Sequence, residues 1–131
     1  MKLLIDTSVW VEYLRGSATA VVTELDGYLD RESVLVCGPV IAELLAGTAP
    51  EDRERLWMAL GNLPWADLDR PAWQRAGELA NQLRRQGLIV SLTDVTIAVA
   101  AMTADADLWS RDQDFIRIGE HVPELSLHGT G

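Results

Sequence analysis

The sequence predicts an α/β fold with three layers, in which helices cover both faces of a central, mostly parallel sheet of about four to five strands. Two observations favour this class. Short apolar runs alternate along the chain with longer amphipathic or apolar stretches, as strands alternate with helices. These short runs are apolar throughout, which is typical of strands buried on both faces. At 131 residues the chain has the length of one domain, so we expect residues 1–131 to form a single domain.

The individual elements follow from apolar periodicity and from the residues that begin and end helices. Asp and Ser cap the start of a helix, Pro suits its first turn, and Gly suits its end. On these signals Gly16, Gly47 and Gly87 each end a helix. The expected strands are residues 3–5, 34–37, 65–68 (weak), 107–110 and 125–127 (at an edge). The expected helices are residues 7–15, 18–29, 39–46, 50–61, 71–86 and 92–104, with a short one within 111–118. The tail from about residue 119 carries only the edge strand.

The helix expected over residues 92–104 differs from the others because it is apolar on nearly all sides. We therefore expect it at the centre of the domain. The five tryptophans stand mostly at inward positions of the expected helices and strands, which favours core packing for them. Trp10 stands near the first candidate site residue, so contact with a nucleobase or a partner remains an alternative for it.

Composition excludes a membrane protein and a disulfide-rich one. The longest stretch without a charge has 11 residues, far short of a membrane span. The apolar run at the N-terminus is too short for a signal peptide, so we expect a cytoplasmic protein that does not associate with membranes. Cys37 is the single cysteine, which excludes an internal disulfide and a cysteine-based metal site.

The net charge of −9 argues against nucleic-acid binding through a broad basic surface. It does not exclude a nucleic-acid substrate. Acids that bind divalent cations count as negative charge until the metal is bound.

Acidic residues follow the carboxyl ends of several expected strands, where ligands bind in an open parallel sheet. Gathered carboxylates repel one another unless a cation neutralises them, and Mg²⁺ and Mn²⁺ prefer oxygen ligands. Two such cations can bridge a phosphodiester, activate a water and stabilise the leaving oxygen, giving a 5′-phosphate and a 3′-hydroxyl. Asp6 and Asp94 are the best direct ligands. The full candidate set is Asp6, Glu43, Asp94, Asp112 and Asp114.

Helix capping is the structural alternative for three of these acids. Asp6, Asp94 and Asp112 stand at helix starts, and Ser91 with Asp94 has the spacing of a capping box. Glu43 cannot cap, since it lies within an apolar helix. Its burial there would be costly without a counter-charge or a metal, which favours a functional role.

Four blocks of the sequence resemble the signature blocks of PIN domains, and most closely those of VapC-type toxins. They read LIDTS at residues 4–8 with Trp10, PVIAELLAG at 39–47, LTDVTIA at 92–98 and SRDQDF at 110–115. They stand in the order and at the spacing of the family, and the likeness extends from residue 1 to about 118. The resemblance implies a PIN-like α/β/α fold and an endoribonuclease dependent on Mg²⁺ or Mn²⁺.

The resemblance also implies roles for single residues. Asp6, Glu43 and Asp94 match the three core acids of the family and Asp112 the fourth, whereas Asp114 matches an acid whose role varies. Ser8 and Ser110 match positions that line the site with hydroxyl groups. Serine at position 110, where the family often has threonine, keeps the hydroxyl.

The same resemblance implies partners. These are an antitoxin of the VapB type, whose C-terminal segment places a basic side chain among the acids, and an RNA substrate. A homodimer is expected, and contact with DNA only through the antitoxin. Charge complementarity would make the acids a binding site as well as a catalytic one.

Arginines are candidates for binding the phosphates of the substrate. Arg84 and Arg85 end the helix before the Asp94 block, Arg111 adjoins the acids, and Arg15 ends the first helix. The alternative is a favourable charge at a helix C-terminus. Catalysis without metal would need histidine, and His121 and His128 both lie in the tail, where we expect them at the surface.

Other α/β proteins also gather acids around Mg²⁺. Receiver domains and haloacid dehalogenase-like phosphatases need a lysine late in the chain, whereas Lys2 is the only lysine here. Ser8 also stands where the phosphatases have their second aspartate. The remaining alternative is a catalytically silent acidic module that binds a basic partner protein with or without metal.

Overall fold

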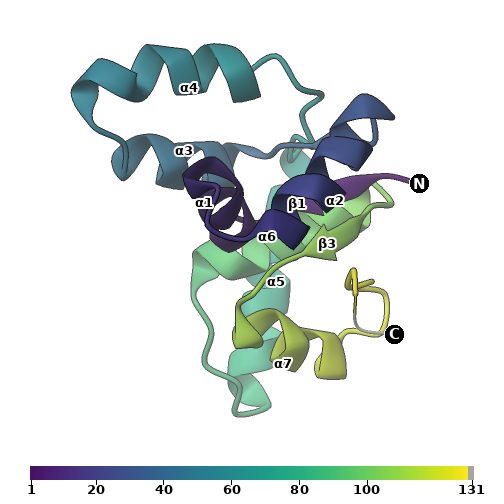
Figure 1. The fold of residues 1–131 in the computed structure, drawn as a ribbon. Helices are drawn as coiled ribbons and strands as arrows, with labels where there is room; N and C mark the ends of the chain where they lie inside the picture. The colour runs from purple at the N-terminus through teal and green to yellow at the C-terminus, as the bar shows by residue number, and fades with distance from the viewer. Residues whose placement is uncertain (130–131) are drawn as a thin grey trace.

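The structure is a computed structural model that describes residues 1–129, and in it a parallel sheet lies between helices (Figure 1). The strands are β1 (Leu3–Ile5), β2 (Val34–Leu35) and β3 (Asp107–Trp109). The helices are α1 (Thr7–Arg15), α2 (Thr19–Asp30), α3 (Gly38–Ala46), the 3₁₀ turn η1 (Pro50–Asp52), α4 (Arg53–Leu60), α5 (Arg70–Arg85), α6 (Leu92–Thr103) and α7 (Gln113–His121). Helices α3 and α4 lie at one end of the molecule and α7 at the other (Figure 1).

The sheet has the order β2-β1-β3, with both pairs parallel. Two further segments touch its edges through single parallel bridges, Val36 to Trp65 and Leu108 to Leu127. The strands expected over residues 65–68 and 125–127 therefore shrink to one bridge each. A proline precedes each segment, at positions 64 and 123, and proline has no N–H to donate to a ladder.

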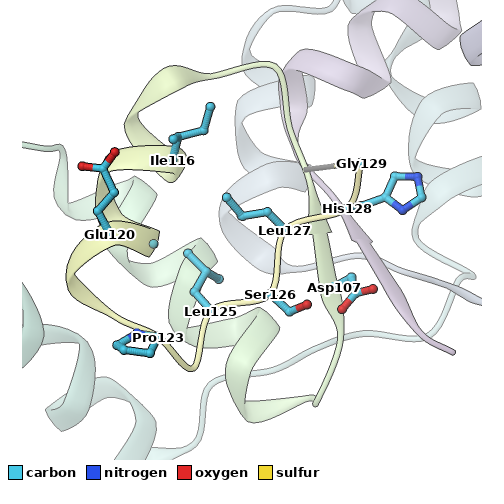
Figure 2. A pocket seen from close by; sticks show the side chains of 10 residues that line it. Asp107, Ile116, Glu120, Pro123, Leu125, Ser126, Leu127, His128 and Gly129 are labelled. Atoms are coloured by element: carbon cyan, nitrogen blue, oxygen red, sulfur yellow. The ribbon is translucent and has the colours of Figure 1, made fainter. Parts of the chain in front are cut away.

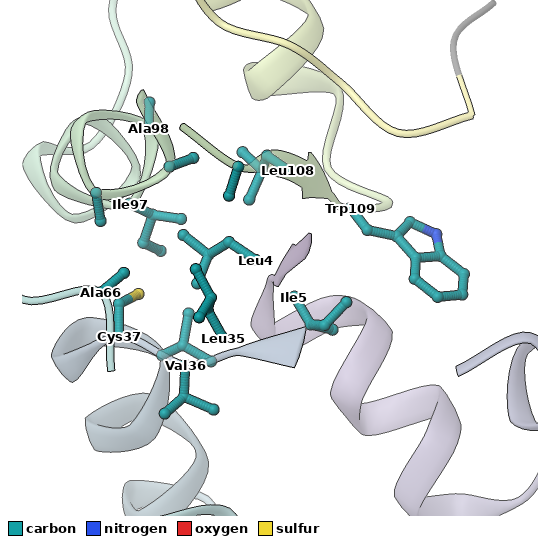
Figure 3. Packing of buried hydrophobic residues seen from close by; sticks show 14 of the residues in the cluster. Leu4, Ile5, Leu35, Val36, Cys37, Ala66, Ile97, Ala98, Leu108 and Trp109 are labelled. Atoms are coloured by element: carbon teal, nitrogen blue, oxygen red, sulfur yellow. The ribbon is translucent and has the colours of Figure 1, made fainter. Parts of the chain in front are cut away.

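Helices cover both faces of the sheet. Leu4 is in register with Leu35 and Leu108. Figure 3 shows these three leucines on the side that faces Ile97 of α6. Trp109 of β3 lies on the opposite side, where its ring contacts the ring of Tyr28 in α2 at a centroid distance of 6.3 Å. The predicted three-layer α/β arrangement is confirmed.

Helix α6 is central, as its composition predicts. All seven residues from Val95 to Ala101 are buried. Buried side chains from the sheet and the helices form one cluster with them, and Trp10 and Phe115 are the largest of its fully buried members. The buried residues that follow Asp94 anchor the first turn of α6, and Asp94 there lies near enough to Asp6 and Asp112, which follow β1 and β3, to be repelled by them.

Caps set most helix ends where the sequence predicts them. Asp6 and Asp112 cap α1 and α7 with their side chains, and Ser91 caps α6. Gly16 and Gly87 take positive φ values of 65° and 85° after α1 and α5, a conformation that other residues adopt only with strain.

The tryptophans divide differently from the expectation. Trp10 and Trp109 are buried, whereas Trp57, Trp65 and Trp73 are exposed by 47%, 36% and 54%. The prediction of mostly inward tryptophans is therefore wrong. The exposed rings of Trp57 and Trp65 contact each other at a centroid distance of 6.0 Å.

Among the described residues, no helix combines the length and the apolar character that crossing a membrane requires.

Candidate functional site

Asp6 directly follows β1 and is the most buried of the candidate acids, with 5% of its surface exposed. Its carboxylate oxygen Oδ2 accepts hydrogen bonds from the hydroxyl of Ser8 at 2.8 Å and from that of Ser110 at 2.7 Å. The two serines come from α1 and from the loop after β3, and their hydroxyl oxygens are 3.4 Å apart. Both hydroxyls therefore contact Asp6, and together they hold its carboxylate in one orientation.

The loop after β3 is folded against α1 by further hydrogen bonds from its backbone. The N–H of Arg111 donates to the hydroxyl oxygen of Ser8 at 3.0 Å, and the N–H of Asp112 donates to that of Ser110 at 2.9 Å. Asp112 in turn accepts from the N–H of Asp114 at 2.9 Å and so begins α7. This loop therefore presents two carboxylates toward the start of α6.

Asp94, Asp112 and Asp114 form what we call the acidic cluster. One carboxylate oxygen from each can be chosen so that all three lie within 4.8 Å of one another. Burial raises the pKa of Asp94 to about 6, and repulsion from Asp112, Asp6 and Asp114 adds to this effect. The hydroxyl of Ser91 opposes it. An aspartate that is hard to ionise in its own surroundings is one that a cation would stabilise.

Of the three acids for which capping was the alternative, only Asp112 both caps a helix and belongs to the acidic cluster. Asp6 caps α1 outside the cluster, and the capping prediction is wrong for Asp94, because Ser91 caps α6. Asp112 caps α7, and Asp94 donates its backbone N–H to the Ser91 hydroxyl at 3.1 Å while its carboxylate faces the cluster. Asp6 caps α1 through a long contact of 3.4 Å from the N–H of Ser8. The ends of three helices therefore converge on one acidic region.

Glu43 lies outside the acidic cluster, and its side chain is exposed. The prediction that it is buried in an apolar helix is wrong, because Ala42 and Ala46 beside it are exposed as well and leave α3 with a solvent-facing side. The hydroxyl of Thr7 donates to Glu43 Oε1 at 2.8 Å. Sequence reasoning missed Thr7, since no local spacing indicates a partner in another helix.

Glu43 and Asp6 lie close enough to the start of α3 to influence Cys37. The thiol of Cys37 is fully buried, and burial raises its pKa to about 11. The negative charges of Asp6 and Glu43 contribute to this increase. Asp6 and Glu43 therefore both lie near Cys37. Asp6 also lies near Asp94, because its charge helps to raise the pKa of Asp94.

The candidate arginines differ in their surroundings. Arg111 Nε is 3.1 Å from Glu12 Oε2, in an exposed ion pair beside the acids. Glu12 follows Ser8 by one helical turn, a spacing that could have revealed it as a neighbour of this loop. Arg84 and Arg85 are exposed in the last turn of α5, and Arg15 is exposed at the end of α1.

The two histidines of the tail have different positions. His121 is exposed, as expected. His128 is half-buried instead: its Nε2 is 2.7 Å from Glu24 Oε2, and its ring lies 4.9 Å from the Trp109 ring. The prediction of a surface residue is wrong for His128, because the last residues fold back onto β3.

A cavity of about 720 Å³ lies between α7 and the C-terminal segment, away from the acids. Figure 2 shows Leu125 and Leu127 of that segment pointing toward α7. None of the candidate site residues lines it. A much smaller cavity of about 50 Å³ is lined by Ser110, Arg111 and Asp112 of the candidate site.

Three comparisons relate the chain to known proteins. The model of the PIN domain family matches residues 3–121. Ribonuclease VapC11 of Mycobacterium tuberculosis is 32% identical over 118 residues, covering 86% of this chain and 88% of that protein. Among solved structures, VapBC2 from Rickettsia felis bound to a DNA fragment from their promoter has a TM-score of 0.79 at 22% identity, covering 98% of both chains. VapBC-1 from nontypeable Haemophilus influenzae has a TM-score of 0.76 at 17% identity, covering 98% of this chain and 97% of that one.

Proposed function

This chain belongs to the PIN domain family, and from that premise we propose that it is a divalent-metal-dependent endoribonuclease, the toxin of a toxin–antitoxin pair. The family membership and the ribonuclease relatives support the ribonuclease activity. The acidic cluster supports the dependence on metal. We propose that the protein acts in the cytoplasm, where its RNA substrate is found.

The observation that carries the proposal is the acidic cluster with the raised pKa of Asp94. Three carboxylates within 4.8 Å form an all-oxygen donor set, which suits Mg²⁺ or Mn²⁺. A cation bound between these three carboxylates would also remove the repulsion among them. The residues present therefore fit a hard divalent cation.

In this proposal Asp94, Asp112 and Asp114 hold the cation, and Asp6 and Glu43 complete the site directly or through water. A bound Mg²⁺ or Mn²⁺ would supply positive charge that activates a water and stabilises the oxygen leaving the phosphate. Water attack gives products with a 5′-phosphate and a 3′-hydroxyl.

The other residues of the site orient Asp6 or bind the phosphates of the substrate. The Ser8 and Ser110 hydroxyls hold Asp6 in one orientation through Oδ2. Arg111 adjoins the acids and is the best placed cation to bind a phosphate of the substrate, in exchange for its exposed partner Glu12. Arg84 and Arg85 would bind phosphates farther along the RNA.

We also propose that the partner is a VapB-type antitoxin with a basic residue that enters the acids, and that the toxin forms a homodimer. DNA would be contacted only through the antitoxin. The solved relatives named VapBC support this assembly by analogy of fold.

The experiment that tests the function is cleavage of total RNA and of purified tRNA by the protein with Mg²⁺, with Mn²⁺ and with EDTA. Asp94→Asn and Asp112→Asn keep the shape of the side chain and remove its charge, and Asp67→Asn is a matched control outside the site. We expect discrete fragments with 5′-phosphates only for the wild type and the control, and only with metal. A folded wild type that cuts neither RNA but binds a basic peptide without metal would support the silent binding module instead.

A further inference from the structure

Thr7 joins two elements of the site that are far apart in the sequence. It is the first residue of α1 and follows Asp6 directly. Its hydroxyl donates to Oε1 of Glu43 in α3 at 2.8 Å, across 36 positions of the chain. The hydroxyl is not needed to start α1, because Asp6 is the residue that caps this helix.

The contact matters because, within residues 1–129, it is the one hydrogen bond or ion pair that the Glu43 side chain makes. Glu43 is exposed, and a free glutamate at a helix surface samples several rotamers. A hydrogen bond from a half-buried hydroxyl selects one of them. It occupies Oε1 and leaves Oε2 for another ligand.

The first turn of α1 thereby organises two carboxylates at once. Ser8 donates to Asp6 Oδ2 at 2.8 Å, and Thr7 donates to Glu43 Oε1 at the same distance. In both cases a hydroxyl of α1 uses one oxygen of a carboxylate. The packing of α1 against α3 brings the backbones of the two helices close enough for this arrangement.

We infer that Thr7 is a positioning residue that holds Glu43 for the divalent cation of the site. The inference rests on the proposed function, and it assigns to Thr7 no contact with the cation or with RNA. Residues that orient metal ligands contribute about 10- to 100-fold to metal affinity or activity.

The test compares Thr7→Val, which keeps the shape and removes the hydroxyl, with Thr7→Ser, which keeps the hydroxyl. Thr19→Val is the matched control, since Thr19 is the exposed first residue of α2. Mn²⁺ binding is measured from the electron paramagnetic resonance signal of free Mn²⁺, and RNA cleavage is measured beside it. Thermal unfolding confirms that each variant is folded, and Thr7→Ala replaces Thr7→Val if the valine variant is not.

We expect Thr7→Val to weaken Mn²⁺ binding about tenfold, Thr7→Ser to restore most of it, and Thr19→Val to bind like the wild type. The decisive variant is Thr7→Val combined with Glu43→Gln. If Thr7 acts through Glu43, adding Thr7→Val to Glu43→Gln produces no further loss.

Two results would overturn the inference: unchanged Mn²⁺ binding in Thr7→Val, or a further loss of similar size in the Glu43→Gln background. Both require a wild type that binds Mn²⁺ and cuts RNA. A wild type that does neither refutes the proposed function itself, so the two failures are distinguishable.

Discussion

Asp94 is the residue at which electrostatics opposes folding. Its pKa is raised from 3.8 to about 6, so the folded chain binds this proton more tightly than the unfolded chain does. As the pH rises from about 4 to 6, the unfolded state loses the proton first and the metal-free fold loses stability. The penalty is complete above pH 6 and absent below about pH 4.

We therefore expect Asp94→Asn to stabilise the metal-free protein at pH 7.5. Solvent screening at this half-exposed side chain reduces the gain to about 1 kcal/mol, or about 3 °C in the melting temperature. Melting curves in EDTA at pH 7.5 and pH 4 measure it. The gain disappears at pH 4, and an equal gain at both pH values would contradict the assigned pKa.

Ser110 is expected to affect cleavage through two hydrogen bonds. Its hydroxyl donates to Asp6 at 2.7 Å and accepts from the N–H of Asp112 at 2.9 Å. Ser110→Ala removes both contacts, so we expect a loss of about tenfold or more in the rate of RNA cleavage. Ser17→Ala, at an exposed serine between α1 and α2, is the control in the same assay. A cleavage rate equal to that of the control would show that cleavage does not depend on the hydrogen bond from Ser110 to Asp6.

For single residues, the sequence predicts the features that depend on neighbouring positions in the chain. The caps at Asp6 and Asp112 follow from their place before helical stretches, and both are confirmed. Asp94 is not a cap, because Ser91, three residues before it, caps α6 by accepting from its N–H. The environment of Glu43 was misjudged because alanine counts as apolar yet tolerates solvent. The bond from Thr7 to Glu43 could not be predicted, since it depends on how two helices pack.

Among the elements, the C-terminal segment departs most from the sequence prediction. It reaches β3 through a single bridge at Leu127 and is fastened by His128, whose ring packs against the rings of Trp109 and Tyr28. The prediction of an edge strand captured its place beside the sheet. The sequence did not indicate that the segment forms only one bridge or that His128 is half-buried, because His128 contacts Glu24 and Tyr28 of α2, which are far away in the sequence.

His128→Ala is expected to lower the free energy of unfolding by about 1 kcal/mol, because it removes two ring contacts and the partner of Glu24. His121→Ala is a matched control, since His121 is exposed. Chemical denaturation of both variants measures the difference. Equal unfolding free energies for the two would show that the segment contributes nothing to stability.

The fold of the whole molecule was the most predictable level. Alternating apolar runs and helical stretches predict the parallel sheet and its two helical layers, and the all-apolar stretch over residues 92–104 predicts the central helix. The number of full strands was not predictable. Whether an edge segment forms a strand or a single bridge depends on whether a few of its backbone N–H and C=O groups find partners in the neighbouring strand. The single-domain organisation of residues 1–131 stays a prediction, for which limited proteolysis is the test.

A cation that binds only the folded chain should stabilise the whole molecule. At a concentration one hundred times its dissociation constant, Mn²⁺ would add about 2.7 kcal/mol, or roughly 8 °C in the melting temperature. Asp112→Asn should lose most of this increase, and NaCl at equal ionic strength should not reproduce it. An increase of the same size in Asp112→Asn would place the cation somewhere other than the acidic cluster.

The capping aspartates have a consequence for how such a protein can be disarmed. Asparagine caps a helix about as well as aspartate, so Asp6→Asn and Asp112→Asn keep the start of α1 and α7 while removing charge from the site. A single base change in the gene converts an aspartate codon into an asparagine codon. Under the proposed function, cells that lose the antitoxin have a short mutational route to a chain that still folds and no longer cuts RNA, and survivors of its unopposed expression should be enriched in these substitutions.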